Sequence, residues 1–346
     1  MKKNFRIKTL KIGYDFNPVI IAEIGINHGG ALKIAKKMAK LAINSGAHII
    51  KHQTHIVNDE MSSEAQKNKI GYIGKSIYDL MEKCALNEKD ELELKLYVEK
   101  LGSIFLSTPF SRAAVDRLVK FNVPAFKIGS GECNNYPLLE YICNFKKPVI
   151  LSTGMNTIKD IKKSVKIIEK NKIPYALLHT TNIYPTPYNL IRLGALEDLK
   201  KKFKNAVIGL SDHSKSNLAC LGAIAMGASI VERHFTDKMT RKGPDISNSM
   251  DPEALRKLSR DAKIMKLMRG GEKKPVKEEK VVRDFAFASV VTISKIKKGE
   301  KFSKKNIWVK RPGGGDFLAR DYNKILGKKA KKLISSNRQL KKTDIL

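Results

Sequence analysis

Two short polar segments each follow an apolar run: Ala206-Val207-Ile208-Gly209-Leu210 leads into Ser211-Asp212-His213, and Ala228-Ser229-Ile230-Val231 leads into Glu232-Arg233-His234. Each apolar run is typical of a buried parallel strand, and a helical stretch at 218–226 lies between them. Ligands gather at the carboxyl ends of parallel strands. Because the placement repeats on successive strands, the two histidines are predicted to share one divalent metal ion. Two protein ligands leave several coordination positions open, which favours Mn²⁺ or Mg²⁺ over a closed zinc site.

Apolar stretches of strand length alternate with amphipathic helical patterns, such as those at 32–44 and 88–101. The eight stretches are 19–24, 47–51, 103–107, 125–128, 148–151, 176–178, 207–210 and 229–231. Eight βα units predict an α/β fold, a (β/α)₈ TIM barrel over residues 1–268. Residues 5–14 precede the first strand and alternate around Gly13. They are predicted to form an N-terminal hairpin that plugs the barrel floor.

The composition changes after the last predicted barrel helix at 252–267. A charged segment with Gly and Pro predicts a linker over 269–282. Residues 283–346 carry short β-like runs, at 288–293 and 307–309, broken by glycine-containing turns. They predict a small β-rich second domain near the lower size limit for independent folding. We expect this domain to lean on the barrel or on a second subunit.

Composition and charge narrow the class of protein. The 346 residues are 42% hydrophobic, which is enough for a sizeable core. No apolar run approaches the roughly 20 residues that cross a bilayer, no apolar signal core follows the basic start, and the four cysteines show no CxxC spacing. We therefore expect a cytoplasmic protein with no membrane partner. The net charge of +33 comes from lysines spread over nearly every predicted helix, which argues against a nucleic-acid partner.

Polar side chains follow every predicted barrel strand. In strand order they are Glu23, Asn27 and His28; Lys51 and Gln53; Thr108 and Phe110; Lys127, Ser130 and Glu132; Ser152, Thr153 and Gly154; Asn182 and Tyr184; Ser211 and His213; Glu232 and His234. Residues two apart on a strand share a face, and burying such groups without partners is costly. Eight strands that end in this way predict an active site at the top of the barrel.

The residue types at these strand ends indicate a chemistry. Two lysines, Lys51 and Lys127, together with hydroxyl and amide donors suit a phosphate and a neighbouring carboxylate. Glycines at 129, 131 and 154 let backbone amides approach the same oxyanions. Glu23 and Glu132 are the acid–base candidates, because burial beside lysines tunes proton transfer. The glycine-containing loops match neither a GxGxxG motif nor a P-loop, so a nucleotide site is not expected.

Long motifs resemble those of the bacterial sialic acid (N-acetylneuraminate) synthases over essentially the whole chain. They are IAEIGINH at 21–28, KHQTH at 51–55, FKIGSGE at 126–132, TNIYPTP at 181–187, GLSDH at 209–213, ERHFT at 232–236, GPD at 243–245 and KRPG at 310–313. The resemblance implies condensation of phosphoenolpyruvate with N-acetylmannosamine and water. The products would be N-acetylneuraminate and phosphate, formed by cleavage of the C–O bond of phosphoenolpyruvate and not its P–O bond.

The resemblance also implies residue roles. Phosphoenolpyruvate would be held by Lys51, Thr108, Lys127, Ser130, Ser152, Asn182 and Ser211, and the sugar by Glu23, Gln53, Tyr184 and Asp245, with Phe110 also at the substrate. The catalytic groups would be Glu23, Lys51, Lys127 and Glu132. His213 and His234 would bind the metal, Mn²⁺ first, with Mg²⁺ or Co²⁺ as alternatives. The small domain resembles an antifreeze-like (SAF) domain, which in this family caps the partner's barrel in a domain-swapped homodimer and brings Arg311 to the N-acetyl group of the sugar.

Three other interpretations remain open at this point. Within the family, the acceptor could be a diacetamido-trideoxy hexose, which would make the enzyme a legionaminic or pseudaminic acid synthase. A metal-dependent aldolase would release free pyruvate and no phosphate. A nucleic-acid-binding protein is suggested only by the charge, and would show a steep dependence of binding on salt.

Overall fold

The computed structural model describes residues 4–67 and 76–346, and it divides the chain into two compact units, Met1–Gly270 and Gly271–Leu346. The division falls inside the segment 269–282 that the sequence predicts as a linker. No helix of the described residues is long and apolar enough to cross a membrane. Each unit has its own hydrophobic core, and each is described here by itself.

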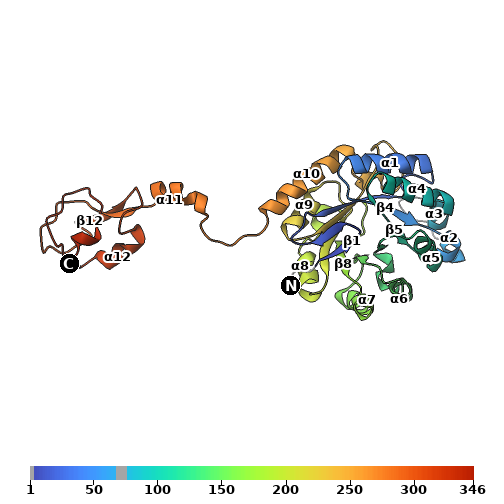
Figure 1. Cartoon of the computed structure of the whole chain (residues 1–346), viewed down its shortest axis with the longest axis horizontal. Coiled ribbons are helices and arrows are strands. Elements are labelled where there is room, and N and C mark those ends of the chain that lie inside the picture. Colours follow the sequence, from blue (N-terminus) through green and yellow to red (C-terminus); the bar gives the residue numbers. More distant parts are fainter. Residues whose placement is uncertain (1–3, 68–75) are drawn as a thin grey trace. The chain divides into compact units, whose positions relative to one another are not determined.

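The first unit is built on a parallel sheet of eight strands (Figure 1). The strands are β3 (Val19–Gly25), β4 (Ile49–Thr54), β5 (Ile104–Pro109), β6 (Phe126–Ile128), β7 (Val149–Ser152), β8 (Tyr175–Thr180), β9 (Val207–Asp212) and β10 (Ile230–His234). Their hydrogen-bonded order is β5-β4-β3-β10-β9-β8-β7-β6, and β5 and β6, at the two ends of this order, also contact each other. The (β/α)₈ barrel predicted from the sequence is therefore confirmed.

Helices alternate with these strands and pack on their outer faces. They are α1 (Leu32–Asn44), α2 (Val57–Glu60), α3 (Ile77–Cys84), α4 (Glu88–Lys100), α5 (Arg112–Lys120), α6 (Tyr136–Cys143), α7 (Ile158–Lys170), α8 (Ala195–Lys202), α9 (Leu218–Ala225) and α10 (Pro252–Met268). Their starts are set by side-chain caps where the sequence provides them. Thr157 and Asp160, for example, form a capping box at α7, and the Asn87 side chain caps α4.

A hairpin of β1 (Asn4–Ile7) and β2 (Leu10–Gly13) precedes the barrel. Its side chains Phe5, Ile7 and Ile12 are buried in one cluster with the inward-facing apolar residues of the barrel strands. These strand residues, such as Val19 and Ile21 of β3, come before the polar strand ends. The hairpin therefore packs at the floor of the barrel, as the sequence predicts.

Several strands continue beyond the apolar runs by which they were predicted. The apolar pattern of β4 ends at residue 51, but the strand continues to Thr54, and β10 continues to His234. The inward positions of β3 show the reason, since Val19 and Ile21 are followed on the same face by Glu23. Each strand is apolar at the floor and polar at the mouth, so hydrophobicity marks only its first part.

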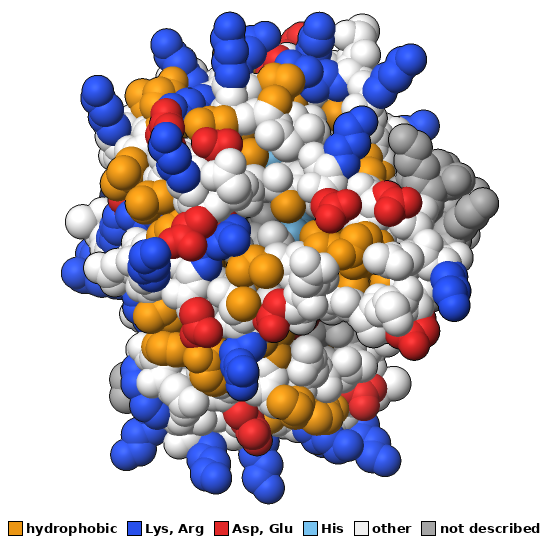
Figure 2. Space-filling view, turned by 90° about the vertical axis from the view of Figure 1, so that its right-hand side faces the viewer, with side chains coloured by type: hydrophobic (Ala, Val, Ile, Leu, Met, Phe, Trp, Pro, Cys, Tyr) orange, Lys and Arg blue, Asp and Glu red, His pale blue; other side chains and the backbone are white. Residues whose placement is uncertain are grey.

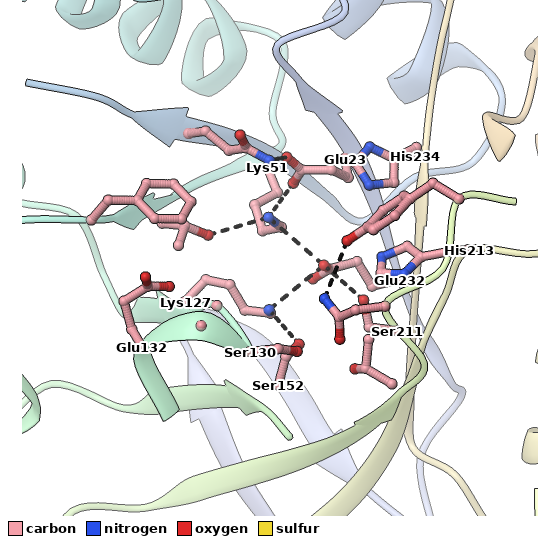
Figure 3. A pocket seen from close by; sticks show the side chains of 18 residues that line it. Glu23, Lys51, Lys127, Ser130, Glu132, Ser152, Ser211, His213, Glu232 and His234 are labelled. Carbon is pink, nitrogen blue, oxygen red and sulfur yellow. Dashed lines mark hydrogen bonds and ion pairs between the residues drawn. The ribbon is translucent and has the colours of Figure 1, made fainter. Parts of the chain in front are cut away.

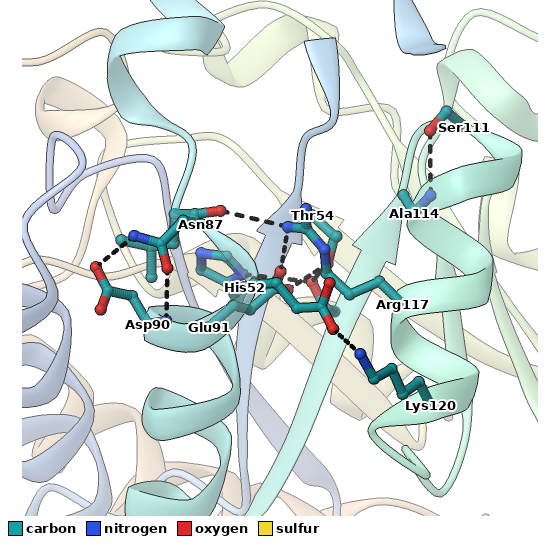
Figure 4. Close-up of polar contacts among 12 residues, drawn as sticks. His52, Thr54, Asn87, Asp90, Glu91, Ser111, Ala114, Arg117 and Lys120 are labelled. Carbon is teal, nitrogen blue, oxygen red and sulfur yellow. Dashed lines mark hydrogen bonds and ion pairs between the residues drawn. The ribbon is translucent and has the colours of Figure 1, made fainter. Parts of the chain in front are cut away.

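The outer face of β4 carries a buried polar network (Figure 4). His52 Nδ1 lies 3.2 Å from Glu91 Oε1 of α4, and Thr54 donates to the same oxygen. Arg117 of α5 donates to the other carboxylate oxygen at 3.1 Å. Burial alone would raise the pKa of Glu91, but the contacts with His52, Thr54 and Arg117 outweigh it and the pKa is lowered. The ionised Glu91 carboxylate thus links β4 to both α4 and α5.

The second unit contains a small antiparallel sheet and two short helices. Its elements are α11 (Lys280–Ala286), β11 (Ser289–Thr292), β12 (Ile307–Lys310) and α12 (Tyr322–Ile325). Its core contains Val290, Phe302, Ile307 and Leu340. The sequence predicts a linker up to residue 282, whereas α11 already begins at Lys280. Its exposed apolar side chains, such as Val281 at 79% exposure, give no amphipathic core pattern that would have predicted a helix.

Candidate active site

A cavity of about 180 Å³ lies at the carboxyl ends of the barrel strands (Figure 3). It is lined by Glu23, Lys51, Gln53, Thr108, Phe110, Lys127, Gly129, Ser130, Gly131, Glu132, Ser152, Thr180, Asn182, Tyr184, Ser211, His213, Glu232 and His234. The structure thus brings together every barrel residue to which the sequence analysis gave a catalytic, substrate-binding or metal-binding role, apart from Asp245. The strand-end residues Asn27, His28, Thr153 and Gly154 do not line the cavity. Asp245 lies just outside the cavity, with Oδ2 3.7 Å from His234 Nδ1.

Four buried charges meet in the centre of this cavity. Lys51 forms an ion pair with Glu23, and its Nζ lies 3.7 Å from Glu232 Oε1. Lys127 Nζ lies 3.6 Å from the same Glu232 oxygen and donates to Ser152 Oγ at 2.7 Å. Two cations and two carboxylates therefore balance one another, and all four side chains are buried.

Burial and pairing act in opposite directions on these four groups. Burial raises the pKa of Glu23 to about 7, against the lowering effect of Lys51. For Lys51 burial alone would lower the pKa, but the two carboxylates outweigh it and the pKa is raised. Burial lowers the pKa of Lys127 to about 8, while Lys127 and Lys51 together keep the pKa of Glu232 lowered despite its burial. Glu23 and Lys127 are thus the two groups of this cluster that titrate near neutral pH.

Glu132 lies in the short 3₁₀ turn Gly131–Asn134 after β6, apart from the four-charge cluster. Burial raises the pKa of its carboxyl to about 7. Its Oε2 is buried, and within the described residues it has no hydrogen-bond partner. A Cβ at position 129 would lie 2.5 Å from this oxygen, so Gly129 is needed for the carboxyl to approach the backbone. Glu132 is therefore a half-buried residue whose carboxyl group can exchange its proton near neutral pH.

Hydroxyl and amide groups line the side of the cavity formed by β6, β7 and β8. The Ser130 hydroxyl accepts a hydrogen bond from the Gly154 amide at 3.1 Å. Asn182 packs so closely on Gly154 that a Cβ there would lie 1.8 Å from Asn182 Oδ1. The Asn182 amide in turn donates to the hydroxyl of Tyr184 at 3.2 Å. These loops hold a set of neutral donors next to Lys127.

His213 and His234 lie side by side at the ends of β9 and β10, with ring centroids 5.4 Å apart. His213 Nδ1 donates to the Thr181 carbonyl at 3.0 Å. In a neutral ring the lone pair is then on Nε2. His234 Nδ1 is buried without a hydrogen-bond partner within the described residues. Burial lowers the pKa of His213 to about 4 and that of His234 to about 3, so both rings are neutral at pH 7.

This pair fits the requirements of a divalent metal ion. A metal ligand must be a neutral imidazole, and its second nitrogen is commonly fixed by a backbone carbonyl or a carboxylate. His213 meets both conditions, and His234 Nδ1 makes no hydrogen bond within the described residues, with only Asp245 Oδ2 near it at 3.7 Å. No group of three or more His, Cys, Asp or Glu side chains within residues 4–67 and 76–346 is placed to hold a metal, so two histidines would be the protein ligands.

Comparison with known proteins shows the family to which the chain belongs. The model of the NeuB family matches residues 38–274, and the model of the SAF domain matches residues 287–346. The chain belongs to the NeuB family. This is the family of sialic acid-type synthases that the motifs resemble, and the C-terminal unit is a SAF domain, so both expectations from the sequence are confirmed.

The relatives in the NeuB family make different sugar acids. The chain is 38% identical to the N,N'-diacetyllegionaminic acid synthase of Campylobacter jejuni over 322 residues, which are 91% of this chain and 96% of that protein. It is 34% identical to the pseudaminic acid synthase of the same organism, over 94% of this chain and 96% of that protein. The crystal structure of the N-acetylneuraminic acid synthetase of Leptospira borgpetersenii, in complex with citrate, has a TM-score of 0.74 and 31% identity, and covers 82% of this chain and 95% of that one.

The sequence analysis placed Glu232 at a strand end but assigned it no role, and it did not select the cavity residue Thr180. Glu232 had a detectable signal, since it precedes His234 on the same strand face, but the strand end alone does not reveal that both lysines approach its carboxylate. Arg311, assigned to the sugar by resemblance, lies exposed in the SAF domain, where its guanidinium is 5.9 Å from the centre of the Phe285 ring. Figure 2 shows that lysine and arginine side chains stand mostly around the margin of one face, with acidic side chains among them, and do not form one basic patch.

Proposed function

We propose that this chain condenses phosphoenolpyruvate with an open-chain 2-acetamido hexose and water, giving a nine-carbon 2-keto sugar acid and phosphate. The observation that carries this proposal is the meeting of Lys51 and Lys127 with two neutral histidines in one buried cavity. The lysines suit an anionic donor substrate, and the histidine pair suits the activation of a carbonyl acceptor.

The proposed site of phosphoenolpyruvate is the part of the cavity around Lys127. Two lysine cations and the hydroxyls of Ser152 and Ser211 lie within reach of one another there. Ser211 now donates to Glu232 at 3.2 Å, and Thr108 accepts from Lys51 at 3.2 Å. A phosphate and a carboxylate offer these donors anionic acceptors like Glu232, and stronger ones than the Thr108 hydroxyl. We infer that Glu232 partly neutralises the two lysines when no substrate is bound. The anionic substrate then replaces some of these ion-pair contacts when it binds.

His213 and His234 would hold the divalent ion, with Mn²⁺ as the first expectation and Mg²⁺ or Co²⁺ as alternatives. When bound, such an ion supplies Lewis-acid polarisation of the aldehyde oxygen of the acceptor. The protein's own part is to keep both rings neutral by burial and to fix the orientation of His213 through the Thr181 carbonyl.

The bond changes require proton transfer as well as anion binding. In the proposed reaction, C3 of phosphoenolpyruvate forms a bond to the aldehyde carbon, and the aldehyde oxygen takes up a proton. Water then adds at C2 and loses one proton, which balances the proton taken up by the aldehyde oxygen. The C2–O bond to phosphate breaks as the C2 hydroxyl becomes the keto group, and its proton passes to the phosphate. Glu23, with its pKa near 7 beside Lys51, is assigned to the proton at the sugar oxygen, and Glu132 is the second acid–base group. Lys51 and Lys127 stabilise the anionic species throughout.

The acceptor sugar has three candidates. The motifs indicate N-acetylmannosamine, as in the N-acetylneuraminate synthases. The identity of 38% to one legionaminic acid synthase supports the diacetamido-trideoxy hexose, while a second legionaminic acid synthase and an N-acetylneuraminate-9-phosphate synthase are each 34% identical. The pseudaminic acid precursor is the third member of the same panel. We further propose a homodimer in which the SAF domain of one protomer brings Arg311 to the N-acetyl group in the partner's barrel.

Phosphate release tests the proposal directly. The enzyme is incubated with phosphoenolpyruvate and each sugar in turn, and phosphate, pyruvate and the mass of the product are measured. With ¹⁸O in the bridging position of phosphoenolpyruvate, C–O cleavage puts the label into phosphate. Free pyruvate without phosphate would indicate the aldolase alternative, and no turnover with any of the three sugars would refute the proposed function.

A further inference from the structure

Behind one wall of the cavity lies a chain of partly buried hydrogen bonds at the end of β4. Gln53 lines the cavity and donates through Nε2 to Glu23 Oε1 at 3.0 Å. Its other amide atom, Oε1, lies 3.1 Å from His55 Nε2. His55 Nδ1 lies 2.8 Å from Glu60 Oε2, at the end of α2. His55 does not line the cavity, and its side chain is only 2% exposed.

The donors and acceptors in this chain of hydrogen bonds restrict how His55 and Glu60 can be protonated. The Gln53 carbonyl oxygen can only accept, so His55 Nε2 must carry a hydrogen. His55 Nδ1 and Glu60 Oε2 must then share one further proton. Either the ring is an imidazolium beside a carboxylate, or a neutral ring accepts from a carboxylic acid. In both cases the His55–Glu60 pair has no net charge and presents an N–H group to Gln53.

The ring of His55 also supports a second wall of the cavity. It is stacked on Phe110, with ring centroids 4.5 Å apart and an angle of 9° between the planes. Phe110 follows β5 and lines the cavity, as Gln53 does. On the other side, α2 is tied to the start of α5, because Asp59 accepts from the Ala113 amide at 2.8 Å. His55 is thus held between a fixed helix and two cavity walls.

We propose that His55 is a positioning residue which, together with Glu60, fixes the Gln53 amide with its NH₂ group toward the cavity. One hydrogen of this group is used by Glu23, and the second is left for the substrate. Since Oε1 faces His55, the Gln53 side chain presents its NH₂ group, a donor, to the cavity. The wall therefore selects an acceptor sugar that places an oxygen here, a hydroxyl or an acetamido carbonyl. The assignment of this wall to the sugar rests on the proposed function.

The protonation of His55 can be measured without any turnover. In ¹⁵N-histidine-labelled enzyme, long-range ¹H–¹⁵N spectra distinguish a ring with Nε2–H from one with only Nδ1–H. The chain has seven histidines, and the signal missing from the spectrum of His55→Phe, or of His55→Gln, identifies His55. We expect Nε2–H in the wild type and in Glu60→Gln, because a glutamine amide can donate to a neutral Nδ1. A His55 ring with an unprotonated Nε2 in the wild type would overturn the proposal.

Kinetics separate positioning from a general loss of stability. His55→Phe keeps a ring against Phe110 but removes the donor, so the KM for the acceptor sugar should rise about 3- to 10-fold while the KM for phosphoenolpyruvate stays within about twofold. Glu60→Gln should keep both values near those of the wild type. Equal changes in both KM values, or none in His55→Phe, would refute the positioning role. If the wild type turns over no sugar, the proposed function fails, and the spectra still decide the arrangement of His55.

Discussion

Lys127 Nζ lies 3.6 Å from Glu232 Oε1, the same carboxylate oxygen that Lys51 Nζ approaches at 3.7 Å. All three side chains are at most 6% exposed. A single carboxylate thus partly neutralises two cations in the place where an anionic substrate is expected. Removing one member of a buried ion cluster leaves uncompensated charge, and the remaining members then bind an external anion more strongly.

Glu232→Gln should therefore lower the free energy of unfolding of the ligand-free enzyme by about 3 kcal/mol, since both lysines lose their shared partner. Phosphoenolpyruvate should recover part of this loss, so that its addition raises the Tm of the variant by more than that of the wild type. Thermal unfolding with and without the ligand measures both effects. A smaller ligand-induced shift in Glu232→Gln than in the wild type would contradict the assignment of this cluster to the anion.

The affinity for phosphoenolpyruvate should fall as the pH rises through about 8. Burial lowers the pKa of Lys127 to about 8, so its ammonium group is charged below this pH and becomes neutral above it. The neutral amine no longer provides the charge-assisted contact. Titration of binding between pH 6 and 10 measures the decline, and Lys127→Arg is the matched control because its guanidinium stays charged. The same alkaline decline in Lys127→Arg would assign it to another group.

His213→Ala and His234→Ala should each abolish turnover and the binding of the divalent ion, while the barrel still folds. Chelator should inactivate the wild type, and Mn²⁺ should restore it. His179→Ala is a matched control, because His179 is also buried but donates to the Ile191 carbonyl and does not line the cavity. It should keep its metal content, as measured by elemental analysis. Full activity of the metal-stripped wild type would show that the histidine pair has another role.

Most of the barrel and of the cavity was predictable from the sequence, because both depend on local rules. Alternation along each strand and the cost of burying polar groups place Lys51 and Gln53 on one face without further information. These local rules do not predict which side chains from different strands contact one another. The approach of both lysines to Glu232 depends on the order of strands around the barrel and on side-chain conformation, and the apolar pattern contains neither.

Two further features could not be predicted from local sequence patterns: how far Asp245 reaches toward the cavity, and the role proposed for His55. Asp245 belongs to the loop after β10, and no periodic pattern indicates how far a loop side chain reaches toward the cavity. The role proposed for His55 depends on donor and acceptor atoms of three residues, Gln53, His55 and Glu60. Their spacing in the sequence gives no sign that they form one chain.

Glu132→Gln should stabilise the protein more at pH 8 than at pH 5. Burial raises the pKa of Glu132 from 4.5 to about 7, so the folded protein favours the protonated form. This contribution to stability is fully present below pH 4.5 and is lost as the pH rises through about 7. Glutamine stays neutral and avoids the loss, which corresponds to about 2–3 kcal/mol at pH 8. Denaturant unfolding of both proteins at the two pH values measures the difference, and an equal effect at both would mean that Glu132 is ionised in the fold throughout.

Arg311→Ala should raise the KM for the N-acetyl sugar far more than the KM for phosphoenolpyruvate. The SAF domain to which Arg311 belongs has its own core, and the guanidinium is exposed on it, so the substitution should leave both units folded. In the proposed dimer each arginine serves the barrel of the other protomer. Steady-state kinetics with each substrate varied in turn test the first statement, and subunit mixing tests the second.

Mixing Arg311→Ala subunits with His213→Ala subunits distinguishes the two geometries. In a mixed dimer with exchanged SAF domains, the barrel with intact histidines receives the intact arginine of its partner, while the other barrel has neither. One of two sites is then complete, and each mixed dimer should regain about half of the wild-type activity. If the arginine acted within its own chain, both sites of the mixed dimer would lack one group and no activity would return. Mass spectrometry of the intact dimers shows whether exchange has occurred, so the absence of recovery after exchange would rule out the swapped cap.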